Sequence, residues 1–276
     1  MDSTLSHVNT LWIGRSLGPL QRACLRSFLH CGHRVRLFAY DAIAGVPDGV
    51  EVCDATDILP RSVIFTHHTG SFALFSDYFR YKLQMLSLGY WIDTDIYCVR
   101  PLQFTDGIVL GWESEEYCNG AVLRLPAKCP LLYALLSIFE ECRLPWWLPF
   151  RERIGFVFDD TQFIRFRTRE RFKIATRHHF SRAKLVADLR WGAGGPRAIT
   201  HNIKTLGLAR EVQPRDVFYP VPYKDYAWIF DPTRSLENVI TPRTSAVHLW
   251  NYLLGSLEGR PVAPGCFFER LLHEGA

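Results

Sequence analysis

The stretch TLWIGRSLGPLQRACLRSFLHCGHRVRLFAY, residues 10–40, decides the fold class of this chain. Its first apolar run, residues 10–13, predicts a short buried strand that ends at a glycine. Apolar residues then recur with helical spacing from residue 19 to residue 30, and a second glycine follows this helix. Residues 35–39 predict a second strand because apolar positions alternate there. A strand, a helix and a strand in this order open a doubly wound α/β domain.

The rest of the chain continues this alternation of strands and helices. A helix is expected from a Ser71 cap to about residue 88, and a loop rich in proline, glycine and aspartate is expected at 44–61. The remaining predicted elements are strands at 90–92, 108–112 and 121–125, helices at 130–142 and from Pro196, a strand-like segment at 217–223, and a last strand or loop at 245–250. The 276 residues show no internal repeat or obvious linker. We therefore expect a single domain, with an N-terminal half at about 8–125 and a second part at about 126–276.

Composition excludes several classes of protein. The 32 Lys and Arg residues exceed the 28 Asp and Glu residues by only four, which is a smaller excess than a dedicated nucleic-acid-binding protein usually has. No stretch approaches 18 apolar residues, and residues 1–7 lack the features of a signal peptide. The eight cysteines are scattered without the spacing of a zinc site, so we expect reduced thiols in a cytoplasmic protein. No Gly-x-Gly-x-x-Gly follows the first strand, so a nicotinamide or flavin site is unsupported.

The triplet Asp93-Thr94-Asp95 directly follows the predicted strand at 90–92. A chain of this composition contains about one Asp-x-Asp triplet by chance, so the position carries more information than the motif. Open α/β sheets bind ligands at the carboxyl ends of their strands. Two carboxylates there suit Mg²⁺ or Mn²⁺, which usually also hold phosphate oxygens. The alternative is a solvated turn in which one aspartate caps backbone amides.

Three further side chains or pairs are candidates for chemistry. Asp77 and Arg80 are neighbours on the helix that leads into the Asp-x-Asp strand. There Arg80 would bind a diphosphate and Asp77 a hydroxyl group, or else the two would form a surface ion pair. His248 lies in an apolar segment and is either a ligand or a core histidine. Trp12, at the end of the first strand, is either core or a flat surface for a nucleobase.

Taken together and in order, these segments resemble a known enzyme family. The segments are Leu11–Gly14, Phe75–Tyr81, Gly89–Asp95, Asn119-Gly120, Gly195-Pro196 and His248–Trp250. They are similar to the sugar-binding Asp-x-Asp glycosyltransferases, which include yeast mannosyltransferases, α1,4-galactosyltransferases and bacterial capsule or lipopolysaccharide enzymes, with the glucosylating clostridial toxins as distant relatives. The resemblance runs from about residue 10 to residue 251. It implies a single GT-A-type domain with a Rossmann-like mixed sheet flanked by helices, in which the half at 8–125 binds the donor.

The resemblance also implies roles for individual residues. Asp95 would bind the metal directly, Asp93 would contact it or the donor, and His248 would complete the metal shell, with Mn²⁺ or Mg²⁺ as the ion. Asp77, Arg80 and Asn119 would be catalytic, with Arg80 on the diphosphate and Asn119 near the transferred sugar. The expected nucleotide-sugar site comprises Trp12, Ile13, Gly14, Tyr40, Ser76, Asp77, Arg80, Tyr81, Asp93, Thr94, Asp95 and Trp250.

The implied activity is metal-dependent transfer of a sugar, with retention of anomeric configuration, from a nucleoside diphosphate sugar. UDP is favoured as the nucleotide. The acceptor would be a glycan, a lipid-linked sugar or a protein, in surface polysaccharide synthesis. Asp159 and Asp160 are acceptor-side candidates, and the Trp146-Trp147 loop, flanked by arginines, is a candidate lid, acceptor wall or contact to the inner face of a membrane.

Two alternatives use some of the same residues. A phosphotransferase or nucleotidyltransferase would also employ carboxylates and Mg²⁺, but the chain has no glycine- and lysine-rich phosphate loop. A non-catalytic module that binds carbohydrate or a membrane surface would account for the tryptophan loop but not for the ordered motifs.

Overall fold

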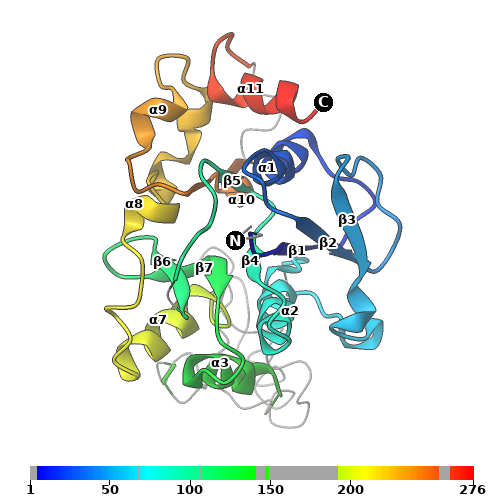
Figure 1. The fold of residues 1–276 in the computed structure, drawn as a ribbon, viewed down its shortest axis with the longest axis vertical. Helices are drawn as coiled ribbons and strands as arrows, with labels where there is room; N and C mark the ends of the chain where they lie inside the picture. Colours follow the sequence, from blue (N-terminus) through cyan, green and yellow to red (C-terminus); the bar gives the residue numbers. More distant parts are fainter. Residues whose placement is uncertain (1–4, 68, 106, 141–146, 149–191, 255–261) are drawn as a thin grey trace, which may run out of the picture.

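A computed structural model describes residues 5–67, 69–105, 107–140, 147–148, 192–254 and 262–276 of the chain (Figure 1). Its strands are β1 (Val8–Trp12), β2 (Val35–Ala39), β3 (Val50–Asp54), β4 (Tyr90–Ile92), β5 (Ile96–Cys98), β6 (Val109–Trp112), β7 (Cys118–Arg124) and β8 (Ala246–His248). Its α-helices are α1 (Pro19–His30), α2 (Ala73–Met85), α3 (Pro130–Glu140), α7 (Pro196–Thr205), α8 (Arg215–Phe218), α9 (Leu236–Val239), α10 (Asn251–Leu254) and α11 (Phe267–Glu274). Three 3-10 helices are η1 (Ala55–Asp57), η2 (Arg61–Val63) and η3 (Tyr223–Phe230).

The main sheet has six strands in the order β3-β2-β1-β4-β7-β6. Strands β3, β2, β1 and β4 are parallel, whereas β7 is antiparallel to both of its neighbours, β4 and β6. Strands β4 and β6 therefore point the same way. Their carboxyl ends lie at one edge of the sheet, together with the beginning of β7. This edge is where a ligand site is expected in such a sheet.

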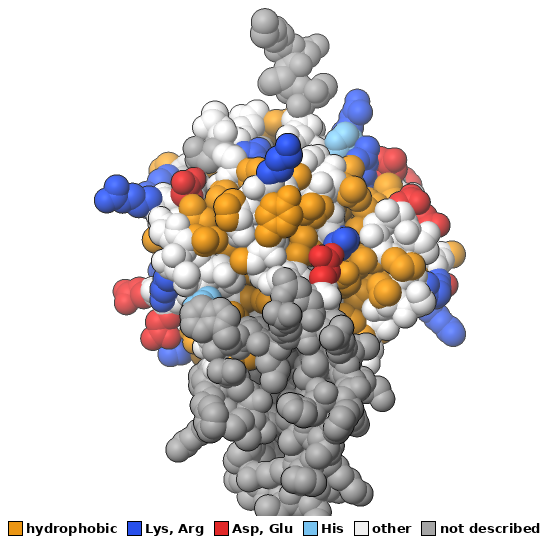
Figure 2. All heavy atoms as spheres, turned by 90° about the horizontal axis from the view of Figure 1, so that it is seen from below, with side chains coloured by type: hydrophobic (Ala, Val, Ile, Leu, Met, Phe, Trp, Pro, Cys, Tyr) orange, Lys and Arg blue, Asp and Glu red, His pale blue; other side chains and the backbone are white. Residues whose placement is uncertain are grey.

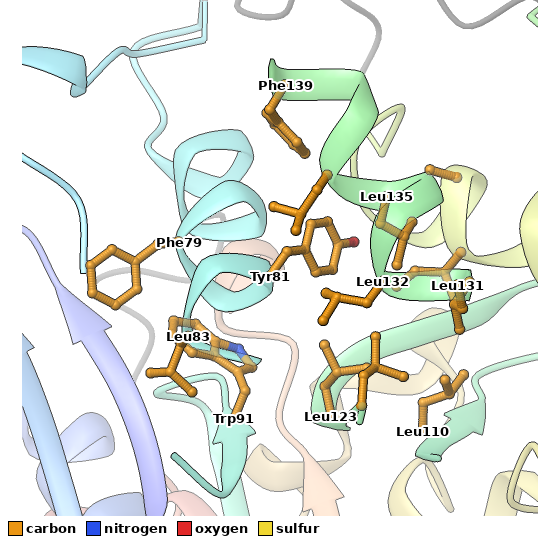
Figure 3. Packing of buried hydrophobic residues seen from close by; sticks show 14 of the residues in the cluster. Phe79, Tyr81, Leu83, Trp91, Leu110, Leu123, Leu131, Leu132, Leu135 and Phe139 are labelled. Atoms are coloured by element: carbon orange, nitrogen blue, oxygen red, sulfur yellow. The ribbon is translucent and has the colours of Figure 1, made fainter. Parts of the chain in front are cut away.

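Helices cover both faces of this sheet. On one face α2, α3 and α7 bury an apolar cluster against alternate residues of the strands, such as Leu11, Trp91 and Leu123. Figure 3 shows part of this cluster, where side chains of α2 and α3 meet those of the strands. On the other face α1 and α8 pack against the intervening residues, such as Val8 and Leu37. The alternation follows from the period of two in a strand.

A second, two-stranded sheet lies beside the first. Strands β5 and β8 pair antiparallel, with Ile96 opposite His248. A third apolar cluster joins this small sheet to α1, η3 and α11. Figure 1 shows α1 and α11 next to each other above the small sheet. The last part of the chain therefore packs against the first helix.

The α/β class is confirmed, and the mixed sheet flanked by helices is the arrangement expected of a GT-A-type domain. The helix at 19–30 and the strands at 35–39 and 90–92 have the predicted bounds. The predicted helix at 71–88 is α2, which begins and ends slightly inside that range. The N-cap residue is Phe72 and not the predicted Ser71, although the Ser71 hydroxyl accepts a hydrogen bond from the Ala73 amide at 3.1 Å.

Two local predictions are wrong. The expected loop at 44–61 contains β3, an exposed edge strand that exists because β2 supplies its hydrogen-bonding partner. The expected strand-like segment at 217–223 is instead the end of α8 and the start of η3. Pro214 and Pro222 are the N-cap residues of these two helices, where the N–H that proline lacks would have no partner within the helix.

Membrane-spanning length is not reached by any helix among the described residues. The seven cysteines in the described part of the chain are free thiols, and five of them are buried.

Candidate active site

Helix α2 presents Asp77 and Arg80 to the interior of the molecule. Both side chains are at most 10% exposed, and Arg80 Nη2 lies 3.3 Å from Asp77 Oδ1. The same nitrogen lies 3.0 Å from Asp93 Oδ1, and Arg80 Nη1 donates to the carbonyl oxygen of Gly120 at 2.7 Å. The guanidinium also lies over the Trp91 ring, 5.0 Å from its centroid. The alternative of a surface ion pair is therefore wrong.

Burial governs the electrostatics of this group. It raises the pKa of Asp77 to about 7, with Arg80 opposing and Asp93 adding to the rise. Burial also raises the pKa of Asp93 despite the nearby Arg80 guanidinium. Perturbed carboxyl groups of this kind are typical of functional sites.

Asp93 stands directly at the carboxyl end of β4. Its amide donates to the carbonyl oxygen of Ala121 at 2.8 Å, which extends the β4–β7 pairing by one residue. Its Oδ1 atom accepts a hydrogen bond from Trp91 Nε1 at 2.7 Å, in addition to the contact with Arg80. No described residue donates a hydrogen bond to its Oδ2. The carboxylate is 27% exposed, so one oxygen is free for a ligand while the other holds the side chain in place.

The pairing of β5 with β8 brings His248 to Asp95. The Leu249 amide donates to the carbonyl oxygen of Asp95 at 3.0 Å, and Asp95 Oδ2 lies 3.2 Å from His248 Nε2. The Asn251 amide donates to the same carboxylate oxygen at 2.9 Å. Burial alone would lower the pKa of His248, but the adjacent Asp95 carboxylate, with Asp93 and Glu113, raises it above the ordinary value. The pKa of Asp95 is lowered because His248 and the Asn251 amide outweigh its burial.

The donor set of Asp93, Asp95 and His248 fits a divalent cation. One ligand atom from each of the three residues lies within 4.8 Å of the others. Two carboxylates and one imidazole provide the oxygen-rich set, with one borderline ligand, that suits Mn²⁺ or Mg²⁺. In addition, the His248 Nδ1 atom is buried with no hydrogen-bond partner among the described residues. Among the described residues, Asp95 is therefore the only hydrogen-bonding or ion-pair partner of the imidazole, through Nε2.

Two glycine motifs pack α7 and β7 against these side chains. A Cβ atom on Gly195 would lie 2.8 Å from Asp77 Oδ2, and one on Gly120 would lie 2.9 Å from Ile199 of α7. The Tyr81 hydroxyl donates to the carbonyl oxygen of Gly194 at 2.8 Å. The Asn119-Gly120 and Gly195-Pro196 pairs therefore allow backbone to approach the Asp77–Arg80 pair closely.

Asn119 begins the β7 edge of the site and is itself fixed by protein contacts. Its Nδ2 atom donates to Glu113 Oε2 at 2.6 Å, and its Oδ1 atom accepts from the Ala121 amide at 2.8 Å. Its carbonyl oxygen accepts from the Tyr219 hydroxyl at 3.2 Å. Sequence reasoning missed Glu113 and Tyr219. Glu113 had a signal, since it is a carboxylate directly after a predicted strand.

The residues expected to bind the nucleotide fall into two groups. Trp12 and Tyr40 lie at the carboxyl ends of β1 and β2, where Trp12 is half-buried over Gly14 and Tyr40 donates its hydroxyl to the Leu59 carbonyl at 2.9 Å. Ile13 also lies at the carboxyl end of β1, half-buried against the apolar cluster that α2, α3 and α7 form with the sheet.

Four other expected residues are Thr94, Ser76, Tyr81 and Trp250. Thr94 and Ser76 are half-buried beside Asp93 and Asp77 in the sequence. Tyr81 is buried with its hydroxyl bound to Gly194, so it positions α7 instead of facing solvent. The Trp250 ring lies 4.0 Å from that of His248, and its Nε1 donates to the Val221 carbonyl at 3.0 Å.

The residues expected to form a lid or to bind the acceptor are either used within the molecule or lie outside the described residues. Trp147 stacks on His201 with ring centroids 4.8 Å apart, so this side chain is used within the molecule. Trp146, Asp159 and Asp160 lie outside the described residues.

Comparison with known proteins connects this site to one class of enzyme. Residues 187–274 match the family model described as "Alpha 1,4-glycosyltransferase conserved region". Among solved structures, the chain is similar to one described as "PaToxG Glycosyltransferase", with 12% sequence identity, 75% of this chain and 71% of that chain covered, and a TM-score of 0.39. A sequence search found no match to this chain among curated proteins.

The protein is a glycosyltransferase. The region that matches includes Gly195, Tyr219 and His248, and therefore the part of the site contributed by α7, α8 and β8. A sugar donor and an acceptor follow as its substrates. This finding favours sugar transfer over the phosphotransferase and over the non-catalytic binding module.

Proposed function

We propose that this glycosyltransferase transfers a sugar from a nucleoside diphosphate sugar with the help of Mn²⁺ or Mg²⁺. The observation that carries the proposal is the convergence of Asp93, Asp95 and His248, with ligand atoms within 4.8 Å of one another, at the sheet edge where α/β domains bind ligands. The sequence resemblance supports the finer features: retention of configuration, UDP as the nucleotide, an acceptor that is a glycan, a lipid-linked sugar or a protein, and a role in surface polysaccharide synthesis.

In this proposal the chain's own residues hold and orient the donor. Asp93, Asp95 and His248 hold the cation, which when bound neutralises the charge that develops on the departing diphosphate. Arg80 fixes the orientation of Asp93 and Asp77, because its guanidinium contacts both carboxylates. Asp77 then receives a sugar hydroxyl.

Other residues are proposed to bind the nucleobase and the transferred sugar of the donor. Trp12 and Tyr40, at the neighbouring strand ends, receive the base, with Ile13, Gly14 and Trp250 completing the nucleotide site. Asn119 lies beside the transferred sugar. Closure of the site against water keeps the donor from hydrolysis.

The decisive experiment measures metal-dependent hydrolysis and transfer with a panel of UDP- and GDP-sugars. Asp95→Asn removes a negatively charged ligand, so we expect a loss of activity of about two orders of magnitude or more and the loss of metal dependence. Asp48→Asn, at an exposed turn, is the matched control and should behave as wild type. Wild-type activity that a chelator leaves unchanged would refute metal dependence.

A second variant separates a ligand from a core histidine. His248→Ala should weaken the Mn²⁺ affinity of the folded protein, in addition to any fall in melting temperature caused by loss of the 3.2 Å contact with Asp95. A purely structural histidine would lower the melting temperature but leave the Mn²⁺ affinity of the folded protein unchanged.

A cytoplasmic location with peripheral contact to the inner face of a membrane belongs to the same proposal. Its support is the sequence of the loop, in which Trp146 is accompanied by arginines at 143, 151 and 153. Trp146 would carry the contact, since Trp147 stacks on His201. Sedimentation with anionic vesicles should therefore decrease in Trp146→Ala, and equal sedimentation of both proteins would refute the contact.

A further inference from the structure

Glu113 is a carboxylate at the ligand-binding edge of the sheet that the proposed roles leave unused. It directly follows β6, whose carboxyl end lies at the same edge as that of β4. The pairing of Gly111 with Asn119 and of Trp112 with Cys118 brings the end of β6 beside the start of β7. Glu113 therefore adds a carboxylate to the edge of the sheet that holds Asp93 and Asp95.

The hydrogen bond between Glu113 and Asn119 uses only one oxygen of the Glu113 carboxylate. Glu113 Oε2 accepts from Asn119 Nδ2 at 2.6 Å, and no described residue donates a hydrogen bond to Oε1. The Asn119 amide cannot be flipped, because its Oδ1 atom must accept the hydrogen bond from the Ala121 amide. One N–H of Asn119 and one oxygen of Glu113 remain without a partner among the described residues. An amide donor and a carboxylate acceptor thus stand side by side.

The Glu113–Asn119 pair is linked through its neighbours both to Arg80 and to His248. Gly120, the residue after Asn119, accepts a hydrogen bond from the Arg80 guanidinium on its carbonyl oxygen. The Asn119 carbonyl oxygen receives the Tyr219 hydroxyl, and the Tyr219 ring meets the edge of the His248 ring with centroids 5.8 Å apart. A group bound between Arg80 and His248 would therefore face the Glu113–Asn119 pair.

We propose that Glu113 and Asn119 together bind neighbouring hydroxyl groups of the transferred sugar, with Glu113 accepting a hydrogen bond and Asn119 donating one. A donor next to an acceptor is the pattern that complements two adjacent hydroxyls, each of which both donates and accepts. The inference rests on the proposed function and deepens it. The substrate class is a donor sugar with free hydroxyls at the positions facing this pair, since a site built to bind a hydroxyl discriminates strongly against an analogue that lacks it.

The test compares Glu113→Gln with wild type. Glutamine keeps an oxygen that can accept from Asn119 but replaces the charged acceptor with an amide. We expect kcat/KM for the best sugar nucleotide of the panel to fall about 10- to 100-fold, the range for a hydrogen bond to a charged group. Binding of UDP with Mn²⁺ should not change, because the inferred hydrogen bonds are made to the sugar and not to the nucleotide. Glu115→Gln, exposed on the same loop, is the matched control.

Deoxy analogues of the same donor identify the interaction. For the analogue lacking the hydroxyl that faces Glu113, wild type and Glu113→Gln should have equal kcat/KM, whereas other deoxy analogues should keep the difference. Glu113→Ala, which also removes the partner of Asn119, should lose at least as much. A Glu113→Gln protein with the kcat/KM of wild type would overturn the inference, and so would parallel losses of UDP affinity and melting temperature.

The failure of the proposed function would be recognised separately. Wild-type protein that binds no nucleoside diphosphate with Mn²⁺, and hydrolyses no sugar nucleotide of the panel, would refute the proposed function and this inference with it. Active wild-type protein that is matched by Glu113→Gln would refute this inference alone.

Discussion

The Arg80 side chain joins three parts of the molecule: its own helix, the end of β4 and the start of β7. It contacts Asp77, Asp93 and the Gly120 carbonyl while lying over the Trp91 ring. Both carboxylates are more costly to bury without a cation than with one. A planar guanidinium can form hydrogen bonds and ion pairs with all of these partners at the same time, whereas a lysine ammonium on a flexible stem does so less well.

The structure therefore predicts different outcomes for two substitutions of Arg80. Arg80→Ala should destabilise the protein by about 3–5 kcal/mol, because it leaves the buried Asp77 carboxylate and the half-buried Asp93 carboxylate without their partner. Arg80→Lys keeps the charge and should lose less stability, yet turnover should still fall by more than about tenfold, since the two carboxylates are no longer held together. Urea unfolding and steady-state kinetics would measure both effects. Arg36→Ala, in the exposed pair with Glu51, is the control and should cost less than about 1 kcal/mol with no loss of activity. Wild-type kinetics for Arg80→Lys would contradict this account.

Asp77 predicts a dependence of stability on pH. Its pKa in the folded protein is raised to about 7 by burial, above the value of an unfolded chain, so the folded state binds more protons between these two pKa values. Stability contributed at this site is fully present at low pH and is lost as pH rises toward 7. Asp77→Asn removes this loss. Relative to wild type, the variant should become more stable by up to about 4 kcal/mol between pH 4 and pH 8, at about 1.4 kcal/mol per unit.

The measurement is urea unfolding of the metal-free proteins across that pH range. Asp48→Asn, at an exposed turn, should show a difference from wild type that does not vary with pH. A constant difference for Asp77→Asn as well would show that the carboxyl group is ionised throughout.

At the scale of elements, Gly89 decides how α2 leads into β4. It adopts a φ of +109°, and an added Cβ would collide with the carbonyl oxygen of His7, which receives the Tyr90 amide at 2.9 Å. Gly89→Ala should therefore destabilise the protein by about 2 kcal/mol or more, through backbone strain and displacement of β1 from β4. Gly207→Ala is the control, because Gly207 also has a positive φ but has open space around its Cβ position. Equal losses in urea unfolding for the two variants would show that the contact with His7 does not matter.

The small β5–β8 sheet is the element that completes the candidate metal site. Its pairing places His248 opposite Ile96, one residue after Asp95. The carboxylates follow β4 directly, but the imidazole arrives only when the last strand pairs with β5. A site formed in this way depends on the folding of both parts of the chain.

At the scale of the whole molecule, the face seen in Figure 2 has no dominant charge among its described side chains. On the face seen in Figure 2, acidic and basic side chains of the described residues are interspersed among hydrophobic ones. The net charge of +4 agrees with this distribution. For the proposed anionic donor, this distribution favours recognition by a local site over recognition by a general positive field.

Binding of the donor should stabilise the whole molecule. A ligand that binds only the folded state at 100 times its Kd adds about 2.7 kcal/mol to the free energy of unfolding. We expect one UDP-sugar of the panel to raise the melting temperature in the presence of Mn²⁺, and a chelator to abolish this rise. Asp95→Asn should show no metal-dependent rise. A rise of equal size without metal would show that the cation does not take part in donor binding.

The sequence by itself determined the elements whose patterns are local. Residues 10–40 specify their strand, helix and strand because hydrophobic periodicity and terminal glycines act over a few residues. The two aspartates were identifiable for a similar reason, since they directly follow a buried strand.

Only the tertiary structure decided which side chains meet. Edge strand β3 forms because β2 offers hydrogen-bonding groups, and Arg80 is buried because β4 and β7 close over α2. Likewise His248 reaches Asp95, and Glu113 reaches Asn119, through the pairing of strands. The physical reason is that periodicity reports which face of an element is buried, whereas a binding site requires partners that are distant in sequence and are brought together only by packing and strand pairing.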